Sequence, residues 1–174
     1  AHLDPILDAA DAVMIARGDL GIECPYEELP IIQRRIAKRC QHRGCPVIVA
    51  THMLESMIEK PHPTRAEVTD VANAVYEQAD AIMLSGETSI GQFPETCVKV
   101  ADRIARRIER SGGANYHEAA SWKDPREKLA RAAVRMANDL DAAALVVFTR
   151  EGRMAPETAW MRPRRASILA LCLK

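Results

Sequence analysis

The sequence lacks an excess of either charge: its 24 Lys and Arg residues are matched by 24 Asp and Glu residues. Proteins that bind nucleic acid or membrane surfaces neutralise phosphates with surplus Lys and Arg, so we expect neither partner. It also lacks an apolar run near the roughly 20 residues that cross a bilayer. The first residues resemble neither a signal peptide nor a transit peptide, so we expect a cytoplasmic protein.

Cysteine is sparse, with five residues and no C-x-x-C pair, so the sequence indicates neither a disulfide framework nor a zinc site. Apolar residues make up 48% and charged residues 28%, which is typical of a globular chain with a real core. The sequence does not begin with Met, and it stops inside an apolar run. We therefore expect a piece of a longer polypeptide.

Short, continuous apolar runs predict five buried strands. They are Ala12 to Ala16, Pro46 to Ala50, Ala81 to Leu84, Ala143 to Phe148 and Ser167 to Leu173. The first three are almost evenly spaced, and each gap holds a helical pattern. This order predicts an α/β fold of repeated βα units with parallel strands. The four methionines near these strands, Met14, Met53, Met57 and Met83, are expected in or near the core.

Two helices carry clear start signals. Thr64-Arg65-Ala66-Glu67 has the pattern of a capping box, in which the Thr side chain accepts from the Glu amide and the Glu side chain reaches back. A second helix is predicted to start at Asp124-Pro125, with Leu129, Ala133, Met136 and Leu140 pointing inward.

Helical periodicity lapses between these helices, around Gly112-Gly113, and returns at Asp124. We therefore predict a first unit at residues 1–112, a linker at residues 113–124 and a second α/β unit at residues 125–174. About 50 residues is below the usual size of an independent domain, so we expect the second unit to be incomplete.

Polar residues follow each of the first three predicted strands. They are Arg17-Gly18-Asp19, Thr51-His52 and Ser85-Gly86-Glu87-Thr88. The carboxyl ends of parallel strands meet at one edge of a sheet, which is where α/β proteins bind ligands. Taken singly, each of these three segments is typical of a turn, a cap or the start of a loop. Their coincidence at three successive strand ends favours a shared site.

The residue types in this predicted site suit an anionic ligand and a hard metal ion. Asp19 is the candidate metal ligand, since Mg²⁺ is usually held by one or two carboxylates plus substrate oxygens. The amides of Gly18 and Asp19 can approach an anion, and Thr51 offers a hydroxyl. Ser85 and Glu87 could pass a proton by way of water. His52 fits a base by its usual pKa, although a hydrogen-bonded position on the rim is the more common role.

Four segments closely resemble pyruvate kinase, in the same order and spacing. They are Met14-Ile15-Ala16-Arg17-Gly18-Asp19-Leu20-Gly21, Ala50-Thr51-His52-Met53-Leu54-Glu55-Ser56-Met57, Pro63 to Glu67 with Asp70 to Val75, and Ile82 to Thr88. The resemblance runs from Leu3 to Cys172, and motifs of this length are far more specific than a lone glycine pattern.

The resemblance implies the last three βα units of a (β/α)₈ barrel, followed by the start of a C-terminal α/β domain. It implies phosphoryl transfer from phosphoenolpyruvate to ADP, giving pyruvate and ATP, with Mg²⁺ or Mn²⁺ and with K⁺, in a homotetramer when full length. Asp19 resembles the metal ligand, and Gly18, Asp19 and Thr51 resemble the phosphoenolpyruvate site. Arg17 matches a substrate-site position, and Ser85 and Glu87, with Thr51, match the region that protonates the enolate.

Several positions depart from the family pattern. His52 stands where the family usually has Gln, and His62 where it usually has Arg. In the segment from Thr149 to Met154, which resembles a sugar-phosphate effector loop, Glu151 and Met154 replace hydroxyl residues. An acid there would repel phosphate, so we do not expect activation by fructose bisphosphate.

The family's phosphoryl-stabilising Lys and second metal-binding carboxylate lie before His2, so we expect this segment alone to be inactive. Two other readings are open at this point. In the first alternative, the chain is a non-catalytic remnant that acts as an oligomer-interaction module. In the second, it is part of another metal-dependent, enolate-forming barrel enzyme, such as an aldolase or lyase.

Overall fold

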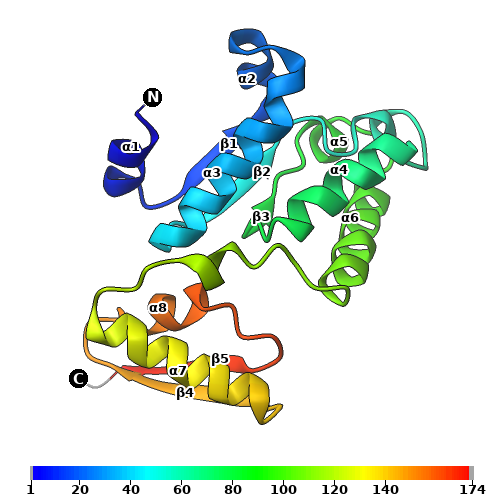
Figure 1. Cartoon of the computed structure of the whole chain (residues 1–174). Coiled ribbons are helices and arrows are strands. Elements are labelled where there is room, and N and C mark those ends of the chain that lie inside the picture. Colours follow the sequence, from blue (N-terminus) through cyan, green and yellow to red (C-terminus); the bar gives the residue numbers. More distant parts are fainter. Residues whose placement is uncertain (1, 173–174) are drawn as a thin grey trace. The chain divides into compact units, whose positions relative to one another are not determined.

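The protein is described by a computed structural model that covers residues 2–172 (Figure 1). It divides into two compact units, the first reaching Tyr116 and the second beginning at His117. Each unit holds its own parallel sheet, so the predicted α/β class is confirmed.

The first unit is built on a three-stranded parallel sheet in the order β1-β2-β3. Its strands are β1 (Val13–Ala16), β2 (Val47–Ala50) and β3 (Ala81–Ile82). Its helices are α1 (Leu3–Ala9), α2 (Arg17–Glu23), α3 (Leu29–Arg43), α4 (Arg65–Tyr76), α5 (Gly86–Ser89) and α6 (Pro94–Glu109), with short 3-10 turns η1 (Tyr26–Glu28) and η2 (Glu55–Ile58). Because each strand is followed by helix, the predicted βα repeat is confirmed.

The core of this unit lies on one face of the sheet. Ile15, Val49 and Ile82 are register partners on that face, and α3 packs against β1 and β2. The opposite face carries Met14, which is 51% exposed, and Ala81, which is also exposed; Ile48 lies between them as the register partner of both. Side chains alternate along a strand, so a continuous apolar run does not reveal which face is covered.

The prediction that four methionines lie in or near the core is therefore wrong for two of them. Met53 and Met57 are fully buried as predicted, whereas Met14 and Met83 are exposed. Met14 is exposed because it points away from the helices, on the uncovered face of the sheet.

Helix ends in this unit follow the sequence signals. Thr64 caps α4, its side chain accepts from the Glu67 amide, and Glu67 reaches back to the Thr64 amide, so the predicted capping box is confirmed. α3 ends at Arg43, and Gly44 caps it with a φ of 64°, in the left-handed region that glycine adopts without strain.

The segment just after α6 belongs to the first unit by its hydrogen bonds. The Ala114 amide donates to the Tyr76 carbonyl at 2.7 Å. Asn115 and Gln78 form a reciprocal pair, since the Asn115 amide donates to Gln78 Oε1 at 3.0 Å and Gln78 Nε2 donates to Asn115 Oδ1 at 3.2 Å. These bonds place the first part of the expected linker against α4.

The second unit contains a two-stranded parallel sheet, β4 (Ala144–Thr149) and β5 (Ser167–Cys172), with α7 (Pro125–Asp139) and α8 (Met154–Trp160). A short 3-10 turn, η3 (Tyr116–Ala119), precedes them. Asp124 caps α7 and shares a capping box with Glu127, as the sequence indicated for the start of this helix.

The inward face predicted for α7 is wrong. Leu129, Met136 and Leu140 are 65%, 64% and 72% exposed. The buried residues of this helix are instead Ala130, Val134 and Ala137. Small side chains let α7 approach β4 and α8 closely, and the apolar residues on its other face make periodicity ambiguous.

Across residues 2–172, no helix combines the length and the apolar character that crossing a bilayer requires.

Replacing Thr64 with Ala should lower the free energy of unfolding by about 1 kcal/mol, because the Glu67 amide loses its capping acceptor. Urea unfolding followed by circular dichroism measures the change. Thr64→Ser keeps the hydroxyl and is the matched control, expected to be near wild type. Equal stability of the Ala and Ser variants would show that the cap contributes little.

Candidate functional site

The three polar segments singled out in the sequence follow three neighbouring parallel strands. Arg17 begins α2 directly after β1, Thr51 follows β2, and Ser85 precedes α5 after β3. Ala16 and Ala50, the last residues of β1 and β2, are register partners. The loops after these strands therefore start from the same edge of the sheet.

Gly18 lies directly against Thr51. A Cβ atom on Gly18 would be 2.9 Å from Thr51 Cγ2, closer than side chains tolerate. The absence of a side chain at position 18 therefore lets α2 approach the segment after β2.

The segment after β2 begins with a strained turn. Thr51 has a φ of 74° and His52 a φ of 54°, both in the left-handed region. A β-branched residue there is a genuine outlier, and each such residue costs about 1 to 3 kcal/mol unless its surroundings hold it. The surroundings of this turn therefore have to supply strong compensating contacts.

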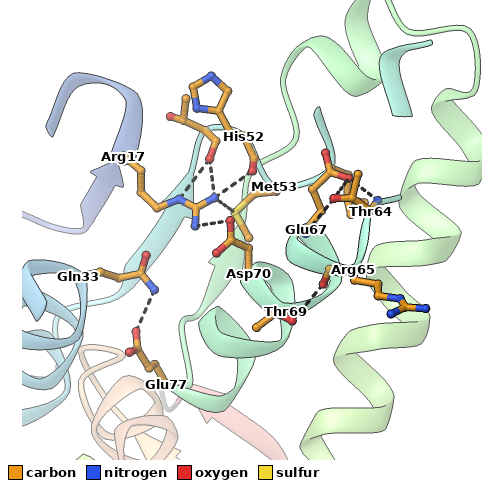
Figure 2. Close-up of polar contacts among 12 residues, drawn as sticks. Arg17, Gln33, His52, Met53, Thr64, Arg65, Glu67, Thr69, Asp70 and Glu77 are labelled. Atoms are coloured by element: carbon orange, nitrogen blue, oxygen red, sulfur yellow. Dashed lines mark hydrogen bonds and ion pairs between the residues drawn. The ribbon is translucent and has the colours of Figure 1, made fainter. Parts of the chain in front are cut away.

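Arg17 supplies those contacts (Figure 2). Its Nε and Nη2 donate to the Thr51 carbonyl at 3.2 and 2.7 Å, and Nη2 also donates to the His52 carbonyl at 3.1 Å. Nη2 lies 3.0 Å from Met53 Sδ, and Nη1 forms an ion pair of 3.2 Å with Asp70 Oδ2. The guanidinium that sequence reasoning assigned to substrate is thus engaged with the turn and with α4.

Glu87 holds the same segment from a second side. The residue is 1% exposed. Its Oε1 accepts from the Leu54 amide at 3.1 Å, and its Oε2 accepts from the Ser85 amide at 2.8 Å. A buried carboxylate needs such donors, and here they tie the loop after β2 to the loop after β3.

Glu67 holds the far end of the segment. Its carboxylate accepts from the Ser56 amide and hydroxyl at 2.6 Å each. It also accepts from the Thr64 amide at 2.7 Å, and Figure 2 shows Glu67 beside Thr64. Burial raises the pKa of Glu67, but the hydrogen bonds from Ser56 and Thr64 outweigh burial, so the pKa lies below its usual value. The sequence predicted Glu67 as the second residue of the capping box at the start of α4. No feature of the sequence predicted its hydrogen bonds to Ser56.

Three polar groups at this edge remain available to a ligand. Within residues 2–172, the exposed carboxylate of Asp19 makes no hydrogen bond or ion pair, and neither do the hydroxyls of Thr51 and Ser85. The ring of exposed His52 is likewise unbonded within that part of the chain.

The donor set suits a metal ion that the substrate helps to hold. Among the described residues, no three His, Cys, Asp or Glu side chains cluster into a metal site. The three strand-end segments hold two carboxylates, and in the described chain that of Glu87 accepts two backbone amides whereas that of Asp19 has no partner. Mg²⁺ commonly uses one or two carboxylates and takes its other ligands from substrate and water, so one free carboxylate fits as part of such a site.

Comparisons with known proteins match both units. The family model "Pyruvate kinase, barrel domain" matches residues 1–98, and "Pyruvate kinase, alpha/beta domain" matches residues 127–174. The chain is 48% identical over 176 residues to pyruvate kinase PKLR of Homo sapiens, covering 96% of this chain and 30% of that protein. It is 43% identical over 177 residues to pyruvate kinase of Geobacillus stearothermophilus, covering 98% and 30%.

A third relative, pyruvate kinase of Mycobacterium tuberculosis strain H37Rv, is 48% identical over 151 residues, covering 87% of this chain and 32% of that protein. The chain therefore spans about a third or less of the length of these curated relatives.

The contribution of Glu67 to stability should depend on pH. Its lowered pKa means that the charged form stabilises the fold fully above the unfolded value near 4.5, and that this stabilisation is lost as pH falls through the lower folded value. Glu67→Gln should therefore lower the free energy of unfolding by about 1 to 3 kcal/mol near neutral pH.

Urea unfolding of wild type and Glu67→Gln at a series of pH values measures the difference. The gap should narrow below about pH 4.5. A gap that stays constant across this range would contradict the assigned role of the carboxylate.

Proposed function

Because this chain belongs to the pyruvate kinase family, we propose that the protein containing it transfers the phosphoryl group of phosphoenolpyruvate to ADP, producing pyruvate and ATP. The observation that carries the proposal is that three of the four family motifs lie at the ends of three adjacent parallel strands. Their free groups, one carboxylate and two hydroxyls, match what a phosphorylated enol and its metal ion require.

The architecture we propose is a (β/α)₈ barrel of which β1, β2 and β3 are the last three strands. In this assignment residues 1–112 belong to the barrel, 113–124 link the units, and 125–174 open the C-terminal α/β domain. The exposed sheet face with Met14 and Ala81 supports it, since a barrel strand turns one face to the helices and the other to the barrel interior. The full-length protein is proposed to be a homotetramer.

Phosphoenolpyruvate is proposed to bind between α2 and the turn after β2. The amides of Gly18 and Asp19, in the first turn of α2, and the hydroxyl of Thr51 would hold its carboxylate. The close approach of Gly18 to Thr51 supports this grouping, because it brings the two elements into contact. Arg17 would hold the turn after β2 through the Thr51 and His52 carbonyls, and it would not contact the substrate.

Asp19 is proposed to ligate Mg²⁺ or Mn²⁺, as its unpaired carboxylate supports. When bound, such an ion would supply positive charge against the negative charge that phosphoryl transfer develops on the substrate. The family also generally uses K⁺, and no residue of this chain is assigned to it.

Protonation of the enolate is proposed to involve the hydroxyls of Thr51 and Ser85, which are free to donate or to order a water molecule. Glu87 was expected to take part in the same relay. Its two carboxylate oxygens already accept backbone amides, so we propose that it shapes the loops that carry these hydroxyls.

The alternative of a non-catalytic remnant is tested by activity. ATP formation from phosphoenolpyruvate and ADP should be present in the full-length protein and absent from residues 1–174 alone, which lack most of the length of the relatives. An inactive full-length protein would favour an interaction module, and C–C bond cleavage without ATP would favour a lyase.

Asp19→Asn in the full-length enzyme should lower metal-dependent turnover by at least about 100-fold while the circular dichroism spectrum stays unchanged. Asp102→Asn is the matched control, since Asp102 is an exposed carboxylate on α6 that pairs only with Arg106 in the described chain. Mg²⁺ titrations of turnover for both variants make the comparison. An unchanged Mg²⁺ dependence in Asp19→Asn would remove Asp19 from the metal site.

A further inference from the structure

We infer that Arg17 and Asp70 form a positioning pair that fixes the direction of the Thr51 hydroxyl without touching substrate. The inference rests on the proposed function, because it assigns to Thr51 a contact with phosphoenolpyruvate. It changes the role of Arg17, from a substrate ligand to the group that holds the turn carrying one.

The first step is the conformation of the turn. Thr51 and His52 both have positive φ, and the carbonyl groups of both residues accept from the same guanidinium. Neither residue is glycine, so the backbone does not adopt this conformation at low cost. The turn therefore depends on whatever satisfies those two carbonyls.

The second step is the shape of the group that satisfies them. A guanidinium presents five N–H donors in a fixed plane, whereas an ammonium is a compact charge on a flexible stem. Arg17 uses Nε and Nη2 on the Thr51 carbonyl and Nη2 again on the His52 carbonyl, all within 3.2 Å. A lysine at position 17 could not make the same set of bonds.

The third step is the orientation of Arg17 itself. Its remaining nitrogen, Nη1, pairs with Asp70 on α4, and the Arg17 side chain is only 14% exposed (Figure 2). Each of its three guanidinium nitrogens thus has a protein partner. The Asp70 side chain is 46% exposed, so it orients the guanidinium through a charged, directional contact and not through burial.

The consequence falls on the Thr51 side chain. Its methyl group faces Gly18 closely, which leaves the hydroxyl pointing elsewhere, unbonded within residues 2–172. Relaxation of the turn would swing this hydroxyl away from its substrate atom. A displacement of about 1 Å at a reacting group can cost roughly 100-fold in rate.

A double-mutant cycle in the full-length enzyme tests the pair. Arg17→Lys and Thr51→Val, which removes the hydroxyl but keeps the branched shape, should each lower kcat/KM for phosphoenolpyruvate by roughly 10- to 100-fold. The kcat/KM of the double variant should be no lower than that of the less active single variant, because both changes remove the same contact. The KM for ADP should stay near wild type in all three.

Multiplying losses in the double variant would mean that Arg17 acts independently of Thr51, and they would overturn the inference. Wild-type kinetics in Arg17→Lys would overturn it as well. Arg39→Lys is the matched control, because Arg39 pairs with Asp4 on α1, and it should leave kcat/KM unchanged.

If Arg17→Lys fails to fold, Asp70→Asn replaces it in the double-mutant cycle with Thr51→Val. It keeps the side-chain shape, and its smaller loss of kcat/KM should also vanish in the Thr51→Val background. Loss that persists there would count against the pair. A wild-type full-length protein that makes no ATP would refute the proposed function instead, so the two failures are distinguishable.

Discussion

The bonds from the Arg17 guanidinium to the Thr51 and His52 carbonyls are the constraint on which the rest of this site depends. They hold a non-glycine turn at positive φ, and Glu87 and Glu67 extend the same support along the segment to Ser56. The three charged groups come from different βα units, so the sheet and its helices must be in place before the segment is held. A charged group suits this task because its hydrogen bonds are stronger than neutral ones.

Much of the fold could be predicted from the pattern of apolar and capping residues in the sequence. The continuous apolar runs located the five strands of residues 2–172 to within a few residues, and their spacing predicted the parallel order. Thr64 and Asp124 marked helix starts because capping chemistry is local and needs only four neighbouring residues. The grouping of the polar strand ends at one sheet edge followed from the same reasoning, since it is a property of any parallel sheet.

Other features depend on contacts between distant residues and left no local signal. Leu129 and Met136 look like core residues by spacing, but the smaller Ala130 and Val134 face the sheet. Glu87 reads as a free acid in its loop, and only the fold brings the Leu54 amide to it. The positive φ of Thr51 could not be read from a β-branched residue, which normally avoids that conformation.

The most direct measurement is a crystal structure of the full-length protein with Mn²⁺ and oxalate, a planar dianion that resembles the enolate of pyruvate. The account predicts positive φ at Thr51, the Arg17 guanidinium on the Thr51 and His52 carbonyls, and oxalate bound beside Gly18 with the metal on Asp19. An Arg17 guanidinium bonded to oxalate, with Thr51 relaxed to negative φ, would contradict it.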